Sequence, residues 1–257
     1  MITLTSDFGL KDPYVAEVKG VILTINPQAT IIDVTHSVEK FNIRQGAFVL
    51  ASAAPYFPKG TIHLAVIDLD VGTKRRAILI QTKQGFFVGP DNGLLMLAAQ
   101  NQGIEHLYEI SNSKFMLPKV FSTFHGRDVF APVAAHLDKG IKPSEFGLEI
   151  TKAAKPKFAN IERRNSSLIG EVWHIDNFGN IITNISQKDL PQNRVVNVKL
   201  PGVLQNISFG KTYAQAKPDE PLALIGSHGF LEIALNQGNA AEKFHAKAGY
   251  KIEVSTE

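Results

Sequence analysis

A change of periodicity near residue 153 constrains the fold more than any other feature of this sequence. Before that point, short apolar runs alternate with segments whose apolar residues recur at intervals of three and four. Residues 2–5 are typical of a buried strand, and the first helical series follows them (Val15, Val18, Val21, Ile22 and Ile25). Because strands that alternate with helices build layered sheets, residues 1–152 are predicted to form an α/β domain with helices on its faces.

Further elements of this domain follow from the same pattern and from capping signals. Asp12 is predicted to be the N-cap of the first helix, with Pro13 at the first helical position. Asn42 and Gln45 resemble a capping box that opens a helix through Ala54. Two more helices are predicted, one after residue 93 and one ending at residue 136. The other strands are predicted at residues 31–34, 61–67, 76–82 and 86–88.

The second part of the chain has a different pattern. Residues 153–167 are polar and basic without clear periodicity, which predicts a linker. Beyond it, residues 168–257 contain short β-type runs, and only residues 240–245 are expected to form a helical turn. These runs predict a small antiparallel barrel or sandwich. They lie at residues 168–175, 181–185, 195–200, 222–226, 230–234 and 251–254.

The composition excludes several classes of function. A net charge of +3, from 27 basic and 24 acidic residues scattered along the chain, predicts no nucleic-acid partner. The absence of cysteine excludes disulfides, thiolate catalysis and cysteine-ligated zinc. The first residues contain no signal-peptide pattern, and no apolar stretch approaches about 18 residues. We therefore expect a cytoplasmic protein without a membrane association.

Polar residues stand where ligands gather in α/β proteins, beyond the carboxyl ends of strands. Asp7, Asp68 and His125 occupy such positions, which predicts a site there. The alternatives are that both aspartates cap turns and that the histidine is a buried core residue. The run Asp68-Leu69-Asp70 also resembles the motif of haloacid-dehalogenase-type phosphatases, although the Asp-Asp pair expected later in such chains is missing. Residues 176–180 have the composition of an ordinary tight turn.

Seven segments, taken in order, resemble the S-adenosyl-L-methionine hydroxide adenosyltransferase family, the hydrolytic relatives of fluorinase and chlorinase. The similarity extends over almost the whole chain. The segments are Thr5–Gly9, Asp33–Ser37, Asp68–Arg76, Gly89–Gly93, Thr123–Asp128, Ile175–Ile181 and Gly226–Phe230. The resemblance implies hydrolysis of S-adenosyl-L-methionine (SAM) to adenosine and L-methionine, with no cofactor and no metal. It also implies a homotrimer with sites between subunits.

The resemblance further implies roles for individual residues. Asp68, Arg75 and His125 are expected to surround the attacking water, with Arg76 as the alternative to its neighbour and with His125 acting as a base or as an orienting group. The expected substrate-binding residues are Asp7 for the ribose diol, Asp176 for the methionine ammonium, Asn180 for adenine, Phe41 and Phe124 as apolar walls, and Ser227, His228 and Gln237 in the remaining ligand shell.

One segment departs from the family pattern. The chain has Leu69-Asp70 where the family usually has Pro-Gly, which adds a negative charge near the expected water site. Two other functions therefore stay open beside the hydrolase. One is a halide-using adenosyltransferase, and the other is a non-catalytic protein that binds SAM or adenosine.

Overall fold

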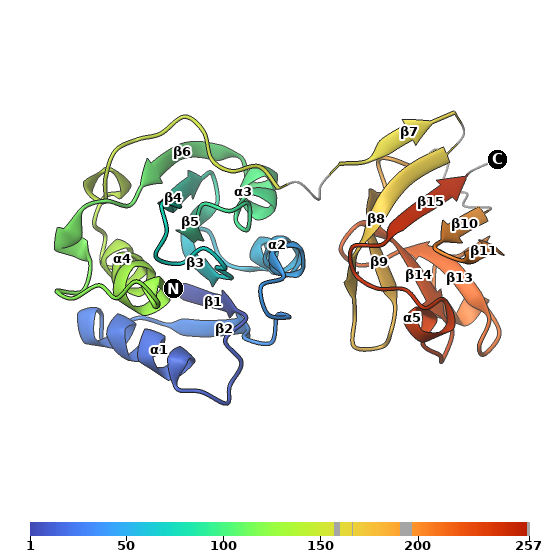
Figure 1. Ribbon diagram of the computed structural model, residues 1–257, viewed down its shortest axis with the longest axis horizontal. Helices are drawn as coiled ribbons and strands as arrows, with labels where there is room; N and C mark the ends of the chain where they lie inside the picture. Colours follow the sequence, from blue (N-terminus) through green and yellow to red (C-terminus); the bar gives the residue numbers. More distant parts are fainter. Residues whose placement is uncertain (157–159, 166, 191–196, 256–257) are drawn as a thin grey trace. The chain divides into compact units, whose positions relative to one another are not determined.

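A computed structural model of the chain describes all residues except 157–159, 166, 191–196 and 256–257 (Figure 1). The described chain divides into two compact units, residues 1–156 and residues 157–257. None of the helices in these described ranges is long and apolar enough to cross a lipid bilayer.

The first unit is built on a six-stranded sheet with the order β2-β1-β3-β5-β4-β6. Strands β1, β2, β3 and β5 are parallel, whereas β4 runs antiparallel to both β5 and β6. The strands are β1 (Ile2–Ser6), β2 (Ile31–Thr35), β3 (Thr61–Val66), β4 (Ala77–Thr82), β5 (Gly85–Pro90) and β6 (Ile104–Glu109). Strand β6 was not predicted from the sequence; it is an edge strand with only one buried residue, Tyr108.

Helices cover both faces of this sheet. They are needed on both faces, because successive apolar side chains of the central strands point to opposite sides. Leu64 and Leu79 pack with α1 and α4 on one face, and Ala65 and Ile78 pack with α2 and α3 on the other. The helices are α1 (Tyr14–Ile25), α2 (Ile43–Ala53), α3 (Met96–Gln102) and α4 (Ala131–Asp138), the π-helix η3 (Gly126–Phe130), and the short 3₁₀ turns η1 (Ala54–Tyr56), η2 (Ser113–Phe115) and η4 (Pro143–Glu145). The predicted α/β class of this unit is confirmed.

The two capping predictions have different outcomes. Asn42 is the N-cap of α2, and its side chain accepts a hydrogen bond from the Gln45 backbone N–H at 3.0 Å. The prediction for Asp12 was wrong, because Pro13 occupies the N-cap position of α1 and no side chain caps that helix. The Asp12 carboxylate is therefore available for another purpose.

The second unit is a nine-stranded, barrel-like sheet (Figure 1), and most of its buried apolar residues form a single cluster. Its main path is β11-β10-β15-β8-β9-β14-β13-β12, with β7 paired to β8, and all pairs are antiparallel except β12 with β13. The strands are β7 (Glu162–Arg164), β8 (Ser167–Ile175), β9 (Ile181–Ser186), β10 (Asn197–Leu200), β11 (Val203–Asn206), β12 (Ser208–Phe209), β13 (Pro221–Ile225), β14 (Phe230–Leu235) and β15 (Lys251–Ser255). The helical pieces are η6 (Tyr213–Gln215) and α5 (Ala240–Lys243).

Three segments of the second unit differ from the sequence analysis. Strand β7 lies inside residues 153–167, the expected linker, and pairs with β8. Strands β11 and β12 were not predicted, since they are short and contain no buried residue. Residues 195 and 196 of the strand predicted at 195–200 lie outside the described residues. The predicted β-barrel class is confirmed.

Candidate active site

A cavity of about 520 Å³ opens at the carboxyl ends of β1 and β3. These strands are parallel neighbours, with Ser6 paired to Val66, so the residues that follow them leave the sheet at the same edge. Of the predicted site residues, the cavity is lined by Asp7, Phe41, Asp68, Phe124 and His125. The structure therefore brings together five side chains from four separate segments.

Arg75 connects Asp68 and His125, the other two residues that are predicted to surround the attacking water. Its Nε donates to both oxygens of Asp68 at 2.9 Å, and its Nη2 also donates to Asp68 Oδ2. The same Nη2 lies 3.0 Å from Nδ1 of His125. The Arg75 and Asp68 side chains are only 7 % and 5 % exposed, so this is a buried ion pair. Asp68 and His125 line the cavity, whereas Arg75 lies behind them and bridges the two.

The contact with Arg75 determines the tautomer of His125. A guanidinium has donors and no acceptor, so Nδ1 must accept this hydrogen bond, and the neutral ring carries its proton on Nε2. Burial lowers the pKa of His125 below its ordinary 6.5, and the positive charge of Arg75 lowers it further. His125 is therefore a neutral Nε2–H donor near pH 7.

The neighbouring Arg76 has a different environment. Its guanidinium donates to Asp91 Oδ2, at 2.9 Å from Nε and 2.5 Å from Nη2, and to the Lys152 carbonyl at 2.8 Å. The side chain is 35 % exposed. Of the two adjacent arginines, Arg75 is therefore the one bonded to Asp68 and His125.

Asp7 and the aromatic residues form another part of the same cavity. Asp7 Oδ2 accepts a hydrogen bond from the Phe41 backbone N–H at 2.8 Å, and Phe41 has a positive φ of 64°. Phe124 makes edge-to-face contacts with Phe8 and Tyr14, at ring-centroid distances of 5.6 and 5.2 Å. The cavity thus combines a carboxylate with an aromatic wall, which suits a ligand with both polar and flat apolar parts.

The Asp68-Leu69-Asp70 run does not present both acids in the same way. Asp68 is buried in its ion pair, whereas Leu69 is 65 % exposed and Asp70 is also exposed. The Asp70 carbonyl accepts from the Thr73 N–H and hydroxyl, at 3.1 and 2.8 Å, and so closes a turn. This geometry favours a role of Asp70 in a turn. It argues against the phosphatase motif, which would use the carboxylates of Asp68 and Asp70 together.

A second cavity, of about 790 Å³, lies in the second unit. Three predicted binding residues line it: Asp176, Asn180 and Gln237. Asp176 Oδ1 accepts from the backbone N–H groups of Phe178 and Asn180 at 2.9 Å, and Oδ2 accepts from the Asn180 side-chain amide at 2.9 Å. Residues 176–180 are thus a tight turn, as their composition indicated, and the turn presents an acid to a cavity.

Gly179 is required for that turn. It has a φ of 82°, and a Cβ atom built there would lie 2.0 Å from the Asn239 side chain. Asn239 is itself the N-cap of α5 and accepts from the Glu242 N–H. A side chain at position 179 would therefore displace both the turn and the helix start.

The remaining two predicted residues lie apart from this lining. Ser227 and His228 are exposed in the turn between β13 and β14. The pKa of the nearby His174 depends on both turns. Burial lowers this pKa most, the charge of Asp176 raises it, and His228 lowers it. The β13–β14 turn and the Asp176 turn therefore influence the same half-buried histidine.

The sequence analysis missed other lining residues. In the first cavity these are Phe8, Asp12, Tyr14, Lys40, Val66, Val71, Thr123 and Gly126, and in the second they are Phe178, Tyr213, Leu235, Asn236, Gly238 and Asn239. Asp12 carried a misleading signal, because an aspartate before a proline is also the pattern of an N-cap. Among the described residues, no group of three or more histidine or acidic side chains is placed to hold a metal ion.

Comparison with known proteins agrees with this arrangement of segments. A crystal structure of an uncharacterized conserved protein from Thermotoga maritima is 40 % identical and covers 99 % of this chain and 100 % of its own, with a TM-score of 0.92. The (R)-S-adenosyl-L-methionine hydrolase of Methanocaldococcus jannaschii is 38 % identical over 266 residues, 99 % of this chain and 95 % of that protein. A fluorinase from Actinoplanes sp. is 31 % identical over 291 residues, with coverage of 99 % and 97 %.

Both units also match the domains of one family. Residues 2–147 match the SAM hydroxide adenosyltransferase N-terminal domain, and residues 170–253 match the C-terminal domain of the same family. The first match contains the Asp68, Arg75 and His125 cluster, and the second contains the Asp176 turn. With both domains present in order, and with relatives similar over nearly their full lengths, the chain belongs to the SAM hydroxide adenosyltransferase family.

Proposed function

We propose that this protein hydrolyses S-adenosyl-L-methionine to adenosine and L-methionine by in-line attack of water on the 5′ carbon. The observation that carries the proposal is the buried Arg75 bridge between Asp68 and His125, at a cavity also lined by Asp7. Four relatives that are 35 to 38 % identical are named (R)-S-adenosyl-L-methionine hydrolase, whereas the fluorinase relatives are 27 to 31 % identical.

The chemistry of a sulfonium explains why so few groups are needed. The bond between C5′ and sulfur breaks as the bond between C5′ and the water oxygen forms, and sulfur keeps the electron pair and leaves as a neutral thioether. Neither a general acid nor a metal has to assist that departure, so we propose a reaction without a cofactor. Holding the water about 3 Å from the carbon supplies a large part of the rate enhancement.

The hydrogen bonds assign different tasks to the polar residues. The Nδ1 lone pair of His125 is used by Arg75, so the ring orients the water through its Nε2–H rather than acting as the base. Asp68 keeps lone pairs beyond those that accept from Arg75, so it can receive the proton lost by the attacking water. Arg75 fixes both groups and adds a positive charge that favours hydroxide.

The proposal is tested by incubating the purified protein with the separated (R) and (S) sulfonium epimers of SAM. Chromatography should show adenosine and methionine in equal amounts, with faster turnover of the (R) epimer, which the names of the relatives specify. Binding of SAM without products would instead indicate a non-catalytic binding protein. Turnover that requires chloride would indicate a halide-using adenosyltransferase.

The identity of the nucleophile is tested by a single turnover in oxygen-18 water. Direct attack puts the label at the 5′ oxygen of the first adenosine, whereas a covalent aspartyl ester cleaved at its carboxyl carbon leaves the first adenosine unlabelled. Activity should also survive exhaustive chelation, since the sulfonium needs no Lewis acid. Unlabelled first-turnover adenosine, or activity restored only by magnesium, would contradict direct displacement.

The assembly and the location of the protein are proposed on the family resemblance. We expect a homotrimer with sites between subunits. Light scattering after size-exclusion chromatography measures the number of subunits directly. A cytoplasmic location is expected as well, and fractionation of the source cells tests it.

A further inference from the structure

The segment Thr123–Asp128 supplies Phe124 and His125 to the cavity, but its last two residues have no role in the proposed reaction. Arg127 and Asp128 lie in η3, a π-helix that directly follows His125. π-Helical turns are uncommon and often occur beside functional sites. The contacts of these two residues show what they hold in place.

Asp128 is a fully buried acid that fixes the loop before His125. Its Oδ2 accepts from the Phe121 backbone N–H at 2.8 Å, and its own N–H donates to the Phe124 carbonyl at 3.1 Å. The Phe124 N–H in turn donates to the Phe121 carbonyl at 3.3 Å. One carboxylate therefore caps the turn that carries the aromatic wall of the cavity.

Arg127 supplies the counter-charge for this buried acid and contacts the same wall. Its Nε donates to Asp128 Oδ1 at 2.7 Å, and its Nη1 donates to Glu17 Oε2 of α1 at 2.7 Å. The guanidinium carbon lies 5.0 Å from the centre of the Phe124 ring and 5.4 Å from that of Phe121. Arg127 thus links helix α1 to a side chain that lines the cavity.

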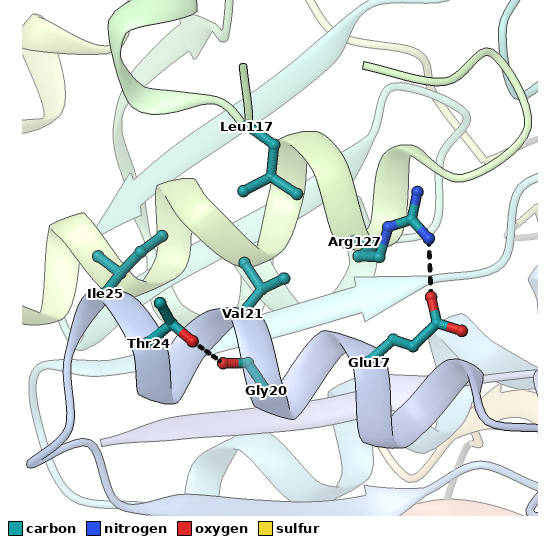
Figure 2. Close-up of a pocket in the computed structure, with 7 residues that line it drawn as sticks. All are labelled: Glu17, Gly20, Val21, Thr24, Ile25, Leu117 and Arg127. Carbon is teal, nitrogen blue, oxygen red and sulfur yellow. Dashed lines mark hydrogen bonds and ion pairs between the residues drawn. The ribbon is translucent and has the colours of Figure 1, made fainter. Parts of the chain in front are cut away.

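The ion pair with Glu17 is accessible from outside the substrate cavity. Figure 2 shows it at one end of a separate groove of about 300 Å³ between α1 and the segment that carries Leu117. The Glu17 and Arg127 side chains are 35 % and 25 % exposed, whereas Asp128 is 0 % exposed. Substitution of Glu17 therefore perturbs Arg127 without placing a new group in the cavity.

We propose that Arg127 and Asp128 are positioning residues for the hydrolysis, which hold the Phe124 ring and the backbone of His125 in their places at the cavity. The inference rests on the proposed function and extends it to two residues that do not line the cavity. A planar guanidinium is required, because it must donate in two directions and lie near aromatic rings. Lysine keeps the charge but cannot reproduce that geometry.

The experiment compares Arg127→Met, Arg127→Lys and Glu17→Gln with the unaltered protein. The matched control is Glu149→Gln, which breaks an exposed pair between Glu149 and His106, 2.7 Å apart, in the same unit. Three quantities are measured well below the unfolding temperature: kcat with SAM, the dissociation constant of adenosine by calorimetry, and Tm. Turnover and affinity of the folded protein report positioning, whereas Tm reports stability.

Arg127→Met should lower kcat at least tenfold and weaken adenosine binding at least threefold, and Arg127→Lys should recover less than half of either loss. Glu17→Gln should lower kcat twofold to fivefold, and the control should change neither quantity by as much as twofold. If Arg127→Met does not fold, Arg127→Lys and Glu17→Gln decide the question. Variants that lower Tm but keep kcat and adenosine affinity within twofold of the unaltered protein would overturn the inference.

Failure of the proposed function gives a different result. If the unaltered protein binds adenosine but never hydrolyses SAM, the hydrolase proposal fails, and the adenosine affinities of the same variants still test the positioning of Phe124.

Discussion

The two cavities hold their principal acids in opposite ways. In the first unit, Asp68 is 5 % exposed and its charge is opposed directly by the Arg75 guanidinium. In the second unit, Asp176 accepts hydrogen bonds from two backbone N–H groups and one side-chain amide of its own turn, and these donors carry no net charge. The charge of Asp68 is thus balanced inside the protein, whereas these three donors to Asp176 include no cation, which suits a cationic ligand.

The charge of Asp176 acts on a nearby buried acid, Glu232. Tyr213 donates to the buried Glu232 at 2.6 Å. Burial raises the pKa of Glu232, and the charge of Asp176 contributes in the same direction. A positively charged substrate group placed beside Asp176 would offset this repulsion, as the ammonium of methionine would.

The largest expected effect separates Arg75 from Arg76. Arg75→Ala leaves Asp68 buried without its cation and His125 without its donor, so turnover should fall by roughly 100- to 10 000-fold. Arg76→Ala breaks a partly exposed pair with Asp91 and should change kcat only a few-fold. Asp68→Ala and His125→Ala should also lower kcat far more than they weaken adenosine binding.

Steady-state kinetics and adenosine calorimetry measure this contrast. Circular dichroism checks folding, because loss of one partner of a buried ion pair costs about 3 to 5 kcal/mol. Equal activity of the Arg75 and Arg76 variants, or activity in all variants of the Asp68 cluster, would contradict the assignment.

The next effect tests the second cavity. Asp176→Ala should weaken SAM binding by about 1.5 to 3 kcal/mol, the usual contribution of a hydrogen bond to a charged group. That range corresponds to roughly 10- to 150-fold in the dissociation constant. Adenosine lacks the ammonium, so its affinity should fall much less, only by what Asn180 loses when the carboxylate that accepts its hydrogen bonds is removed. Calorimetry with both ligands measures the difference, and an equal loss for both would show that Asp176 does not bind the amino group.

A smaller effect is expected for Asp7→Asn in the first cavity. The amide keeps an acceptor for the Phe41 N–H but loses the charge that strengthens a bond to the ribose diol. We expect SAM affinity to fall by about tenfold. A 2′-deoxy substrate should bind less tightly than SAM to the unaltered protein and about equally tightly to the variant. A variant that still distinguishes the two substrates would remove Asp7 from the diol site.

The smallest effect concerns pH. Because burial and Arg75 lower the pKa of His125 below 6.5, the ring stays neutral at neutral pH and gains a proton only as the pH falls below that value. Protonation places hydrogen on Nδ1 and ends the hydrogen bond from Arg75. Turnover should therefore be level near pH 7 and decline only on the acidic side of 6.5. A decline that begins above 6.5, or one that persists in His125→Asn, would show that another group controls it.

Much of the fold followed from local patterns. The apolar patterns predicted β1 to β5 and α1 to α4, because the helices bury a periodic stripe and the strands are short apolar runs, of which β1 and β3 are buried on both faces. Strand β6 was not predicted, since an edge strand with a single buried residue lacks that pattern. The prediction that Asp12 is an N-cap was wrong, because an aspartate followed by a proline also suits a loop, and here Asp12 lines the first cavity.

The order of motifs by itself determined the family, the α/β and barrel-like classes of the two units, and the segments that carry Asp7, Asp68, His125 and Asp176. Only the tertiary structure decided that Arg75 rather than Arg76 meets Asp68, and that His125 presents Nε2–H to the cavity. The reason is physical. Arg75 and Arg76 precede β4, where no periodic pattern shows which side chain turns toward Asp68, and a histidine tautomer depends on a donor that is 50 residues away in the chain.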